Sequence, residues 1–320
     1  MQKEQNVLAD IVENIEKVII GKRWAVELIV LAMASGGHVL IEDIPGVGKT
    51  SLVSALSRSV SCSFKRIQFN PDILPSDITG FSVYNQKSGE FDFHPGAAMS
   101  NFVLADEINR ATSKTQSSLL EIMDENQVTV DSKTYRLEEP FMVLATQNPI
   151  EYLGTYPLPE AQIDRFLIKV SIGYPSELDE VRILGLDFET KNSLQPVAQA
   201  SDILDVKRAV ENIYVDNHIK SYIVEIINRT RDHPEILLGA SPRASIALYK
   251  ICKAFALYSG RDYVIPDDVK LLAPYVLCHR LFLTREAKIE KRTPEQIIAD
   301  ILGFVAVPAV AATRARTAQY

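Results

Sequence analysis

Apolar residues follow two different periods along the chain, and these alternate through roughly its first half. Short apolar runs of strand length lie between stretches with helical spacing, such as Leu8, Ile11 and Ile15. Strands that alternate with helices predict an α/β fold, a parallel sheet with helices on both faces. The candidate strands are residues 38–41, 64–69, 101–105, 141–145 and 166–172.

Two segments break this alternation. Residues 81–84 and 90–93 alternate polar and apolar side chains around the turn sequence NQKSG, and residues 128–130 and 134–137 do the same around DSK. Both pairs predict β-hairpins inserted into a sheet whose core does not need them. Such hairpins suit a contact surface for other proteins.

Strand signals disappear after about residue 176, and helical spacing continues from there. Ser241 followed by Pro242 is typical of a helix start, because serine caps the first turn and proline fits its first position. The change in composition falls between residues 175 and 200. We therefore expect an α/β domain over residues 1–180 and an all-helical domain over residues 181–320. The expected helices are residues 203–214, 217–231, 242–258, 266–282 and 294–307.

Charge narrows the class of protein. The 320 residues include 34 basic and 41 acidic side chains, which gives a net charge of −7 and a pI near 5.4. This balance argues against a nucleic-acid partner, since nucleic-acid-binding domains usually have a basic face. The basic pair Arg314 and Arg316 is short enough to be a solvated tail.

Cysteine usage and hydropathy indicate the compartment. Cys62, Cys252 and Cys278 are far apart and form no CxxC motif, which favours reduced thiols inside a cell. No apolar run approaches the roughly 18 residues of a membrane span, and the opening MQKEQN is unlike a signal peptide. We expect a cytoplasmic protein with no membrane partner. The scattered histidines predict no structural metal site.

The strongest signal for chemistry is GVGKT at residues 46–50, between a strand run and a helical stretch that starts at Ser51. The backbone N–H groups of such a loop hold phosphate oxygens, and the helix adds its positive end. Lys49 is expected to reach the β- and γ-phosphates, and Thr50 to hold Mg²⁺. The full pattern has glycine at position 43; Asp43 stands here, a residue type that tolerates left-handed backbone. The alternative is a plain glycine turn.

Polar residues follow two further strand runs. Asp106 and Glu107 end one run; a carboxylate there suits a magnesium shell, and its neighbour suits the polarising of an attacking water. Asn148 follows another run and could orient the same water. The alternatives are a helix cap for the two acids and turn chemistry before a proline for Asn148.

Two arginines complete the candidate site. Arg165, in EAQIDRF, suits an arginine finger, which stabilises charge on the transferring phosphoryl group. Its alternative is a surface ion pair with Asp164 or Glu160. Arg243 opens a helix of the second domain and could touch the γ-phosphate; its alternative is an ordinary surface arginine.

Four strings in order resemble the MoxR family of AAA+ ATPases: EDIPGVGKT, LADEINRATSKTQSSLLEIMDENQVTV, ATQNPIEYLGTYPLPEAQIDRF and SPRAS. The similarity runs from residue 18 into the helical domain. It implies a P-loop core of five parallel strands with two hairpin inserts, followed by a helical lid domain. It also implies ATP and Mg²⁺ as cofactors.

The same resemblance assigns roles to residues. Asp106 and Glu107 match Walker B, Asn148 sensor 1, Arg165 the arginine finger and Arg243 sensor 2. Thr50 and Asp106 would serve the metal. The first hairpin looks like the helix-2 insert and the second like the pre-sensor-1 hairpin. HPGAAMS, which follows the first hairpin, departs from the family's usual run. The residues expected to bind the nucleotide are Ile20, Gly21, Asp43, Pro45, Gly46, Val47, Gly48, Lys49, Thr50 and Ser51.

By resemblance we expect a chaperone-like ATPase that remodels or activates partner proteins, often ones with a von Willebrand factor A domain, including during metal-cofactor insertion. A hexameric ring is the expected assembly, and whether Arg110 also acts in trans stays open. The alternative is a nucleic-acid-associated AAA+ motor, which the acidic charge disfavours. A GTPase is disfavoured because no NKxD motif occurs.

Overall fold

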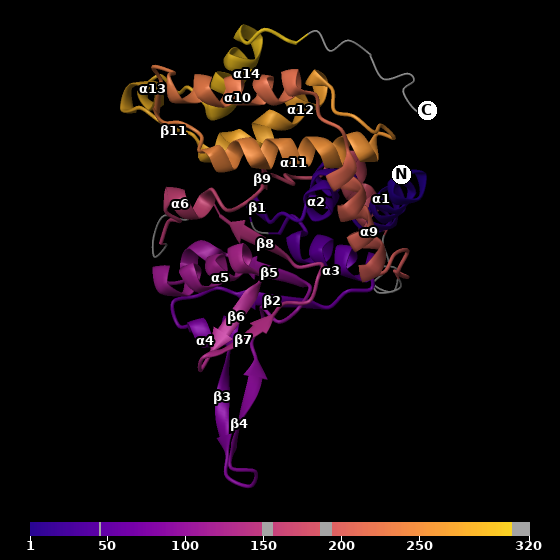
Figure 1. Ribbon diagram of the computed structural model, residues 1–320, viewed down its shortest axis with the longest axis vertical. Helices are drawn as coiled ribbons and strands as arrows, with labels where there is room; N and C mark the ends of the chain where they lie inside the picture. The colour runs from indigo at the N-terminus through magenta and orange to yellow at the C-terminus, as the bar shows by residue number, and fades with distance from the viewer. Residues whose placement is uncertain (45, 149–155, 186–193, 309–320) are drawn as a thin grey trace, which may run out of the picture. The chain divides into compact units, whose positions relative to one another are not determined.

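The computed structural model describes residues 1–44, 46–148, 156–185 and 194–308, and the chain divides into two compact units, Met1–Glu211 and Asn212–Tyr320 (Figure 1). The first unit is α/β and the second is mainly helical. Within the described ranges, no helix combines the length and apolar character that crossing a membrane requires.

A five-stranded parallel sheet forms the centre of the first unit, as the alternating pattern predicts. Its order is β2-β5-β8-β1-β9, so the polar strand β2 lies at an edge and the buried strands β5 and β8 lie inside. Since every strand runs the same way, all their carboxyl ends meet at one edge of the sheet. The strands are β1 (Val39–Glu42), β2 (Phe64–Gln68), β5 (Phe102–Asp106), β8 (Met142–Gln147) and β9 (Ile168–Val170).

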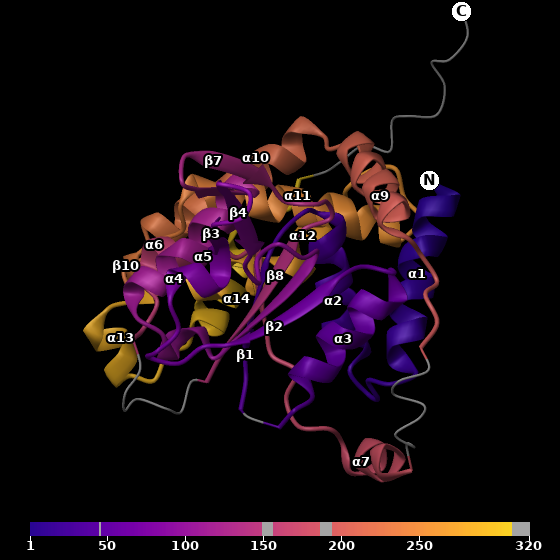
Figure 2. The same ribbon diagram turned by 90° about the horizontal axis from the view of Figure 1, so that it is seen from below.

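Helices cover both faces of this sheet (Figure 2). Val103 and Ala105 pack with Leu119 of α5 in one buried cluster. Alternation along a strand turns Phe102 and Leu104 to the opposite face, where α3 packs against β2 and β5. The helices of this core are α1 (Gln2–Glu16), α2 (Arg23–Ala34), α3 (Lys49–Ser59), α4 (Pro75–Thr79), α5 (Ser113–Glu125) and α6 (Glu160–Ile163).

Both predicted hairpins are present: β3 (Gly80–Asn85) pairs with β4 (Glu90–Pro95), and β6 (Gln127–Val130) with β7 (Lys133–Arg136). The chain crosses itself closely at the base of the first hairpin. A Cβ on Gly96 would overlap the backbone of Ile78 and Gly80, so glycine is required there. In the atypical HPGAAMS segment, the Ala97 and Ala98 N–H groups bond to the carbonyls of residues 77 and 78 (3.0 Å each). This run therefore closes the hairpin.

The two hairpins also touch each other. Phe93 of β4 stacks on Tyr135 of β7, with ring centroids 4.0 Å apart and planes 12° apart. Farther along the first hairpin, Tyr84 and Phe91 are 5.3 Å apart and are 54% and 63% exposed. The β3–β4 hairpin projects well beyond the sheet (Figure 1). It thus presents an aromatic pair to solvent and is joined to the second hairpin nearer its base.

The first unit ends later than the boundary that composition indicates. Helices α7 (Glu177–Leu184) and α9 (Ala200–Asn212) follow β9, and the compact unit extends to residue 211 instead of 180. Ser59 explains the difference, because its carbonyl accepts the N–H groups of Val197 (2.9 Å) and Ala198 (3.1 Å). Asn14 adds a side-chain bond to the carbonyl of Gln195 (3.0 Å). These bonds tie the segment that leads into α9 to the α/β core.

The second unit contains four of the five expected helices, since the one expected over 203–214 is α9 of the first unit, and a small ribbon that helical spacing does not predict. β10 (Ile236–Leu238) pairs antiparallel with β11 (Phe282–Leu283), so the helix expected over 266–282 ends at residue 277. Ser241 caps α11 by accepting the N–H of Arg243 (3.1 Å). The elements are α10 (Asn217–Arg231), α11 (Pro242–Tyr258), α12 (Pro266–Leu277), α13 (Arg285–Ile289) and α14 (Pro294–Phe304).

A buried histidine ties β1 to its neighbours. The Nε2 of His38 lies 3.0 Å from the carbonyl of Met123, and its Nδ1 lies 3.0 Å from the N–H of Val143. These partners require a neutral ring, which donates from Nε2 and accepts at Nδ1. Burial lowers the pKa of His38 to about 4, because charging the ring would cost solvation.

We expect acid to destabilise the fold through His38. Its pKa is lower in the folded chain than the ordinary 6.5, so the folded state takes up fewer protons. Stability is full above about pH 6.5 and is lost as the pH falls toward 4, by roughly 2 kcal/mol at pH 5. Urea denaturation from pH 7.5 to 4.5 measures how steeply the free energy of unfolding falls with pH. This slope should be flatter in His38→Gln than in wild type. The exposed-site control His94→Gln should keep it, and an equal slope in all three proteins would contradict the assignment.

Candidate nucleotide site

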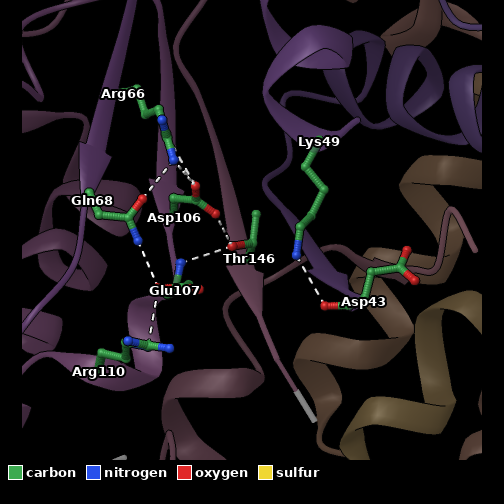
Figure 3. A network of polar contacts seen from close by, with 8 residues as sticks. All are labelled: Asp43, Lys49, Arg66, Gln68, Asp106, Glu107, Arg110 and Thr146. Atoms are coloured by element: carbon green, nitrogen blue, oxygen red, sulfur yellow. Dashed lines mark hydrogen bonds and ion pairs between the residues drawn. The ribbon is translucent and has the colours of Figure 1, made fainter. Parts of the chain in front are cut away.

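Three loops meet at the carboxyl edge of the sheet because of strand register. Ile41 of β1 pairs with Thr146 of β8, and Ala105 of β5 pairs with Ala145. The residues that follow these strands are therefore neighbours: the phosphate loop after β1, the acidic pair at the end of β5, and Asn148 after β8. Figure 3 shows the polar contacts made at this edge.

The phosphate loop has the backbone that its glycines predict. Gly46 and Gly48 have φ angles of 89° and 87°, a region that favours glycine, and Gly48 caps α3. A Cβ built on either glycine would meet no atom within 4 Å, so open space lies before the loop. Lys49 begins α3, and its Nζ donates to the carbonyl of Asp43 (3.0 Å). The ammonium group thus lies over the loop.

The carboxylate of Asp43 has a structural task. It is 6% exposed, accepts the N–H groups of Ile172 and Gly173 (3.1 Å for the latter), and lies 3.3 Å from the Ser171 hydroxyl. These contacts bind the first residue of the phosphate loop to the chain that leaves β9. Aspartate at this glycine position therefore anchors the phosphate loop to the chain after β9, a role that the motif alone does not predict.

The acidic pair is held by a buried threonine. The Thr146 hydroxyl donates to Oδ1 of Asp106 (2.6 Å) and accepts the backbone N–H of Glu107 (2.8 Å). Thr146 is fully buried, so this hydroxyl is shielded from water. Glu107 adopts left-handed backbone, φ 58° and ψ 49°, which ends the strand sharply. Thr146 thus fixes both acids to the central strand; its signal in the sequence is a hydroxyl inside an apolar strand.

Three further polar residues reach the acidic pair from elsewhere (Figure 3). Arg66 of β2 bonds Oδ2 of Asp106 through two nitrogens, at 2.6 and 3.1 Å. Gln68 donates to Oε2 of Glu107 (2.7 Å), and Nε of Arg110 lies 3.1 Å from the same oxygen. Arg66 and Gln68 are not identified from the sequence, because their role depends on β2 pairing with β5.

Arg165 lies away from this edge. It precedes β9, and Leu167 donates its N–H to the carbonyl of His38 at the amino end of β1 (2.8 Å). Arg165 is therefore separated from the phosphate loop by the length of β1, whose four residues rise about 3.3 Å each. Its ion-pair partner is Asp124 (3.2 Å), neither Asp164 nor Glu160.

The other predicted residues have varied settings. Asn148 is buried at the end of β8, and Arg243 is exposed on the first turn of α11 in the second unit. Gly21 has a φ of 71° and lies so close to Asp179 that a Cβ would overlap its carboxylate. The segment of Ile20 and Gly21 therefore lies against the chain beyond β9. Val47 is half-buried in the loop; Thr50 and Ser51 lie in the first turn of α3, and Pro45 lies outside the described residues.

The residues present fit a nucleotide with magnesium. The open space before Gly46 and Gly48 leaves room for phosphate oxygens beside the N-terminus of α3. The hydroxyl of Thr50 and the carboxylate of Asp106 are hard oxygen donors, which Mg²⁺ prefers. No cluster of three or more His, Cys, Asp or Glu side chains within the described ranges has metal-site geometry.

Comparison with known proteins defines the class. The model of the "ATPase family associated with various cellular activities (AAA)" matches residues 38–168, and that of the "AAA lid domain" matches residues 228–301. A candidate ATPase from Cytophaga hutchinsonii has a crystal structure with a TM-score of 0.89 and 38% identity, which covers 96% of this chain and 97% of that one. The protein is thus an AAA ATPase with a helical lid domain.

Three similar proteins show to which family the chain belongs. The uncharacterized protein YeaC of Bacillus subtilis is 53% identical over 94% of this chain and 95% of its own length. Chaperone MoxR1 of Mycobacterium tuberculosis is 41% identical over 96% and 84%, and MoxR of Methylorubrum extorquens is 30% identical over 92% and 93%. The chain belongs to the MoxR family of AAA+ ATPases, as the four strings indicate.

The role of Asp43 is open to a direct test. Asp43→Gly restores the usual glycine but removes the acceptor for the buried N–H of Ile172 and the partly buried N–H of Gly173, so we expect unfolding to become easier by roughly 2 kcal/mol. ATP affinity should change less than Lys49→Ala changes it, because the phosphate-binding N–H groups remain. Urea denaturation and calorimetric titration with ATP measure the two effects. Unchanged stability together with lost ATP binding would instead place the Asp43 carboxylate in nucleotide binding.

Proposed function

We propose that this AAA+ ATPase hydrolyses ATP with Mg²⁺ and uses the cycle to remodel or activate partner proteins. The observation that carries the proposal is the meeting of the phosphate loop, Asp106, Glu107 and Asn148 at one edge of the sheet, held by Thr146. ATP supplies the bond to be broken, and Mg²⁺ the positive charge that offsets its phosphates.

Each residue has one task in this proposal. The loop N–H groups and Lys49 bind phosphate oxygens, while Thr50 and Asp106 serve the cation. Glu107 accepts a proton from the attacking water, which Asn148 orients. Gln68 and Arg110 both contact Oε2 of Glu107, so the other carboxylate oxygen, Oε1, is the one proposed to accept the proton. Ile20 and Gly21 lie near the adenine in this proposal, and Arg243 of the lid domain acts as sensor 2 toward the γ-phosphate.

Arg165 serves a neighbouring subunit in this proposal. It lies at the amino edge of the sheet, whereas its own phosphate loop lies at the carboxyl edge. Such an arginine reaches a nucleotide most simply when a second copy places its loop against the amino edge. A closed ring, which we take to be a hexamer, repeats this contact at every interface.

The clients are proposed to be proteins. The first hairpin carries the exposed pair Tyr84 and Phe91, which suits contact with apolar side chains. A relative bears the name Chaperone MoxR1, which supports a chaperone-like role. A protein with a von Willebrand factor A domain is the proposed partner, and maturation of a metal-dependent enzyme in the cytoplasm is the proposed setting.

Glu107→Gln separates binding from hydrolysis. The amide keeps the shape of the side chain but accepts no proton, so ATP should bind with near wild-type affinity while turnover falls about 10²-fold or more. Calorimetry measures the binding, and phosphate release measures the turnover. Glu121→Gln on α5 is the matched control and should hydrolyse normally. Turnover at the wild-type rate in Glu107→Gln would show that another group is the base.

Mixed oligomers test Arg165. Arg165→Ala should bind ATP but lose about 10³-fold in turnover, and mixing it with Lys49→Ala should restore activity at interfaces that pair an intact loop with an intact arginine. Asp124→Asn removes the ion-pair partner of Arg165 within the chain and should stay active. Light scattering verifies assembly. Absent recovery in proven mixed oligomers, or equal losses in Asp124→Asn and Arg165→Ala, would contradict the trans role.

A further inference from the structure

Arg66 occupies the carboxylate that the proposed function reserves for the cation. Its guanidinium bonds Oδ2 of Asp106 at 2.6 and 3.1 Å, and Thr146 holds Oδ1 at 2.6 Å. Both oxygens of this carboxylate are therefore engaged by the chain itself. The Asp106 side chain is only 11% exposed, whereas that of Arg66 is 46% exposed. A nearly buried negative charge is thus paired with a cation that retains access to water.

The strand pattern puts Arg66 in this place. Along β2, Ile67 packs into the cluster with α5, so Lys65 shares its face while Arg66 and Gln68 share the opposite one. Gln68 pairs in register with Asp106, which leaves Arg66 on the diagonal, within reach of a long side chain. A carboxylate shielded from water is costly without a positive partner. Arg66 supplies that partner from the edge strand.

We propose that Arg66 is the resident counter-cation of Asp106. Magnesium that binds with nucleotide competes with Arg66 for this carboxylate. This inference rests on the proposed nucleotide site. The competition lowers the affinity of the site for free magnesium, so the ion is held well only together with phosphates.

Arg66 also links the cation to the catalytic acid. Its Nη2 donates to Oε1 of Gln68 (2.7 Å), and the Gln68 amide donates to Glu107 (2.7 Å). When Arg66 leaves Asp106, Gln68 loses the contact that fixes its amide against Glu107. Arrival of the cation thus loosens the hold on the proposed base. Arg66 is a positioning residue in this scheme and touches no reacting atom.

Calorimetric titration of ADP at a series of Mg²⁺ concentrations, and in EDTA, tests the competition without turnover. Arg66→Gln should lower the Mg²⁺ concentration that half-saturates the ADP complex by about three- to tenfold, the range expected for a partly exposed ion pair. Affinity for ADP in EDTA should change far less. The matched control is Lys65→Gln, which removes the same charge from the opposite face of β2 and should leave the Mg²⁺ dependence as in wild type.

An Asp106→Asn background identifies the route of the effect. If Arg66 acts through Asp106, then Arg66→Gln should shift nothing further in Asp106→Asn, whereas a general effect on folding or local charge would persist. Thermal unfolding of each variant checks the fold. If Arg66→Gln does not fold, Arg66→Lys, which keeps the charge but loses the fork of donors, should move the half-saturating Mg²⁺ concentration in the same direction by about twofold.

The results separate this inference from the function beneath it. Wild-type protein that binds no ADP at any Mg²⁺ concentration would refute the nucleotide site itself. If folded Arg66→Gln or Arg66→Lys binds ADP but its half-saturating Mg²⁺ concentration is unchanged or higher than in wild type, only the competition is overturned. A shift that Lys65→Gln reproduces, or that survives in Asp106→Asn, would overturn it as well.

Discussion

Parallel pairing of β5, β8 and β1 is the constraint on which the candidate site depends. It brings three loops to one edge, and the hydroxyl of Thr146 then joins Asp106 to the backbone of Glu107. Because this hydroxyl is fully buried, its two bonds are protected from exchange with water. The acids are consequently positioned by the centre of the sheet, and the glycine loop by the neighbouring strand.

The same pairing divides the chemistry between the two edges of the sheet. The phosphate loop and the acids lie where the strands end, whereas Arg165 lies where β1 and β9 begin. A single core domain therefore presents a nucleotide-binding edge and, opposite to it, an arginine paired with Asp124. This ion pair within the chain holds Arg165 in place whether or not a nucleotide is bound.

Much of this arrangement is predictable from sequence, for a local reason. The glycines, Lys49 and the acids belong to short motifs next to apolar strands, and alternating polar and apolar residues predict the hairpins. Arg66 and Thr146 are missed because their partners are set by strand register. Composition does not predict where the first unit ends, because the hydrogen bonds of Val197 and Ala198 to Ser59 join distant parts of the chain. The β10–β11 ribbon is too short to leave a period.

The stacking of Phe93 on Tyr135 gives the hairpins a mechanical property. The first hairpin is clamped at its base, where Gly96 crosses Ile78 without room for a side chain. A force at its tip is therefore not absorbed by bending at a loose root. The stacked rings carry part of that load into the second hairpin, whose chain continues into β8 and Thr146. The stacked rings thus join two hairpins that are distant in the sequence into one braced projection.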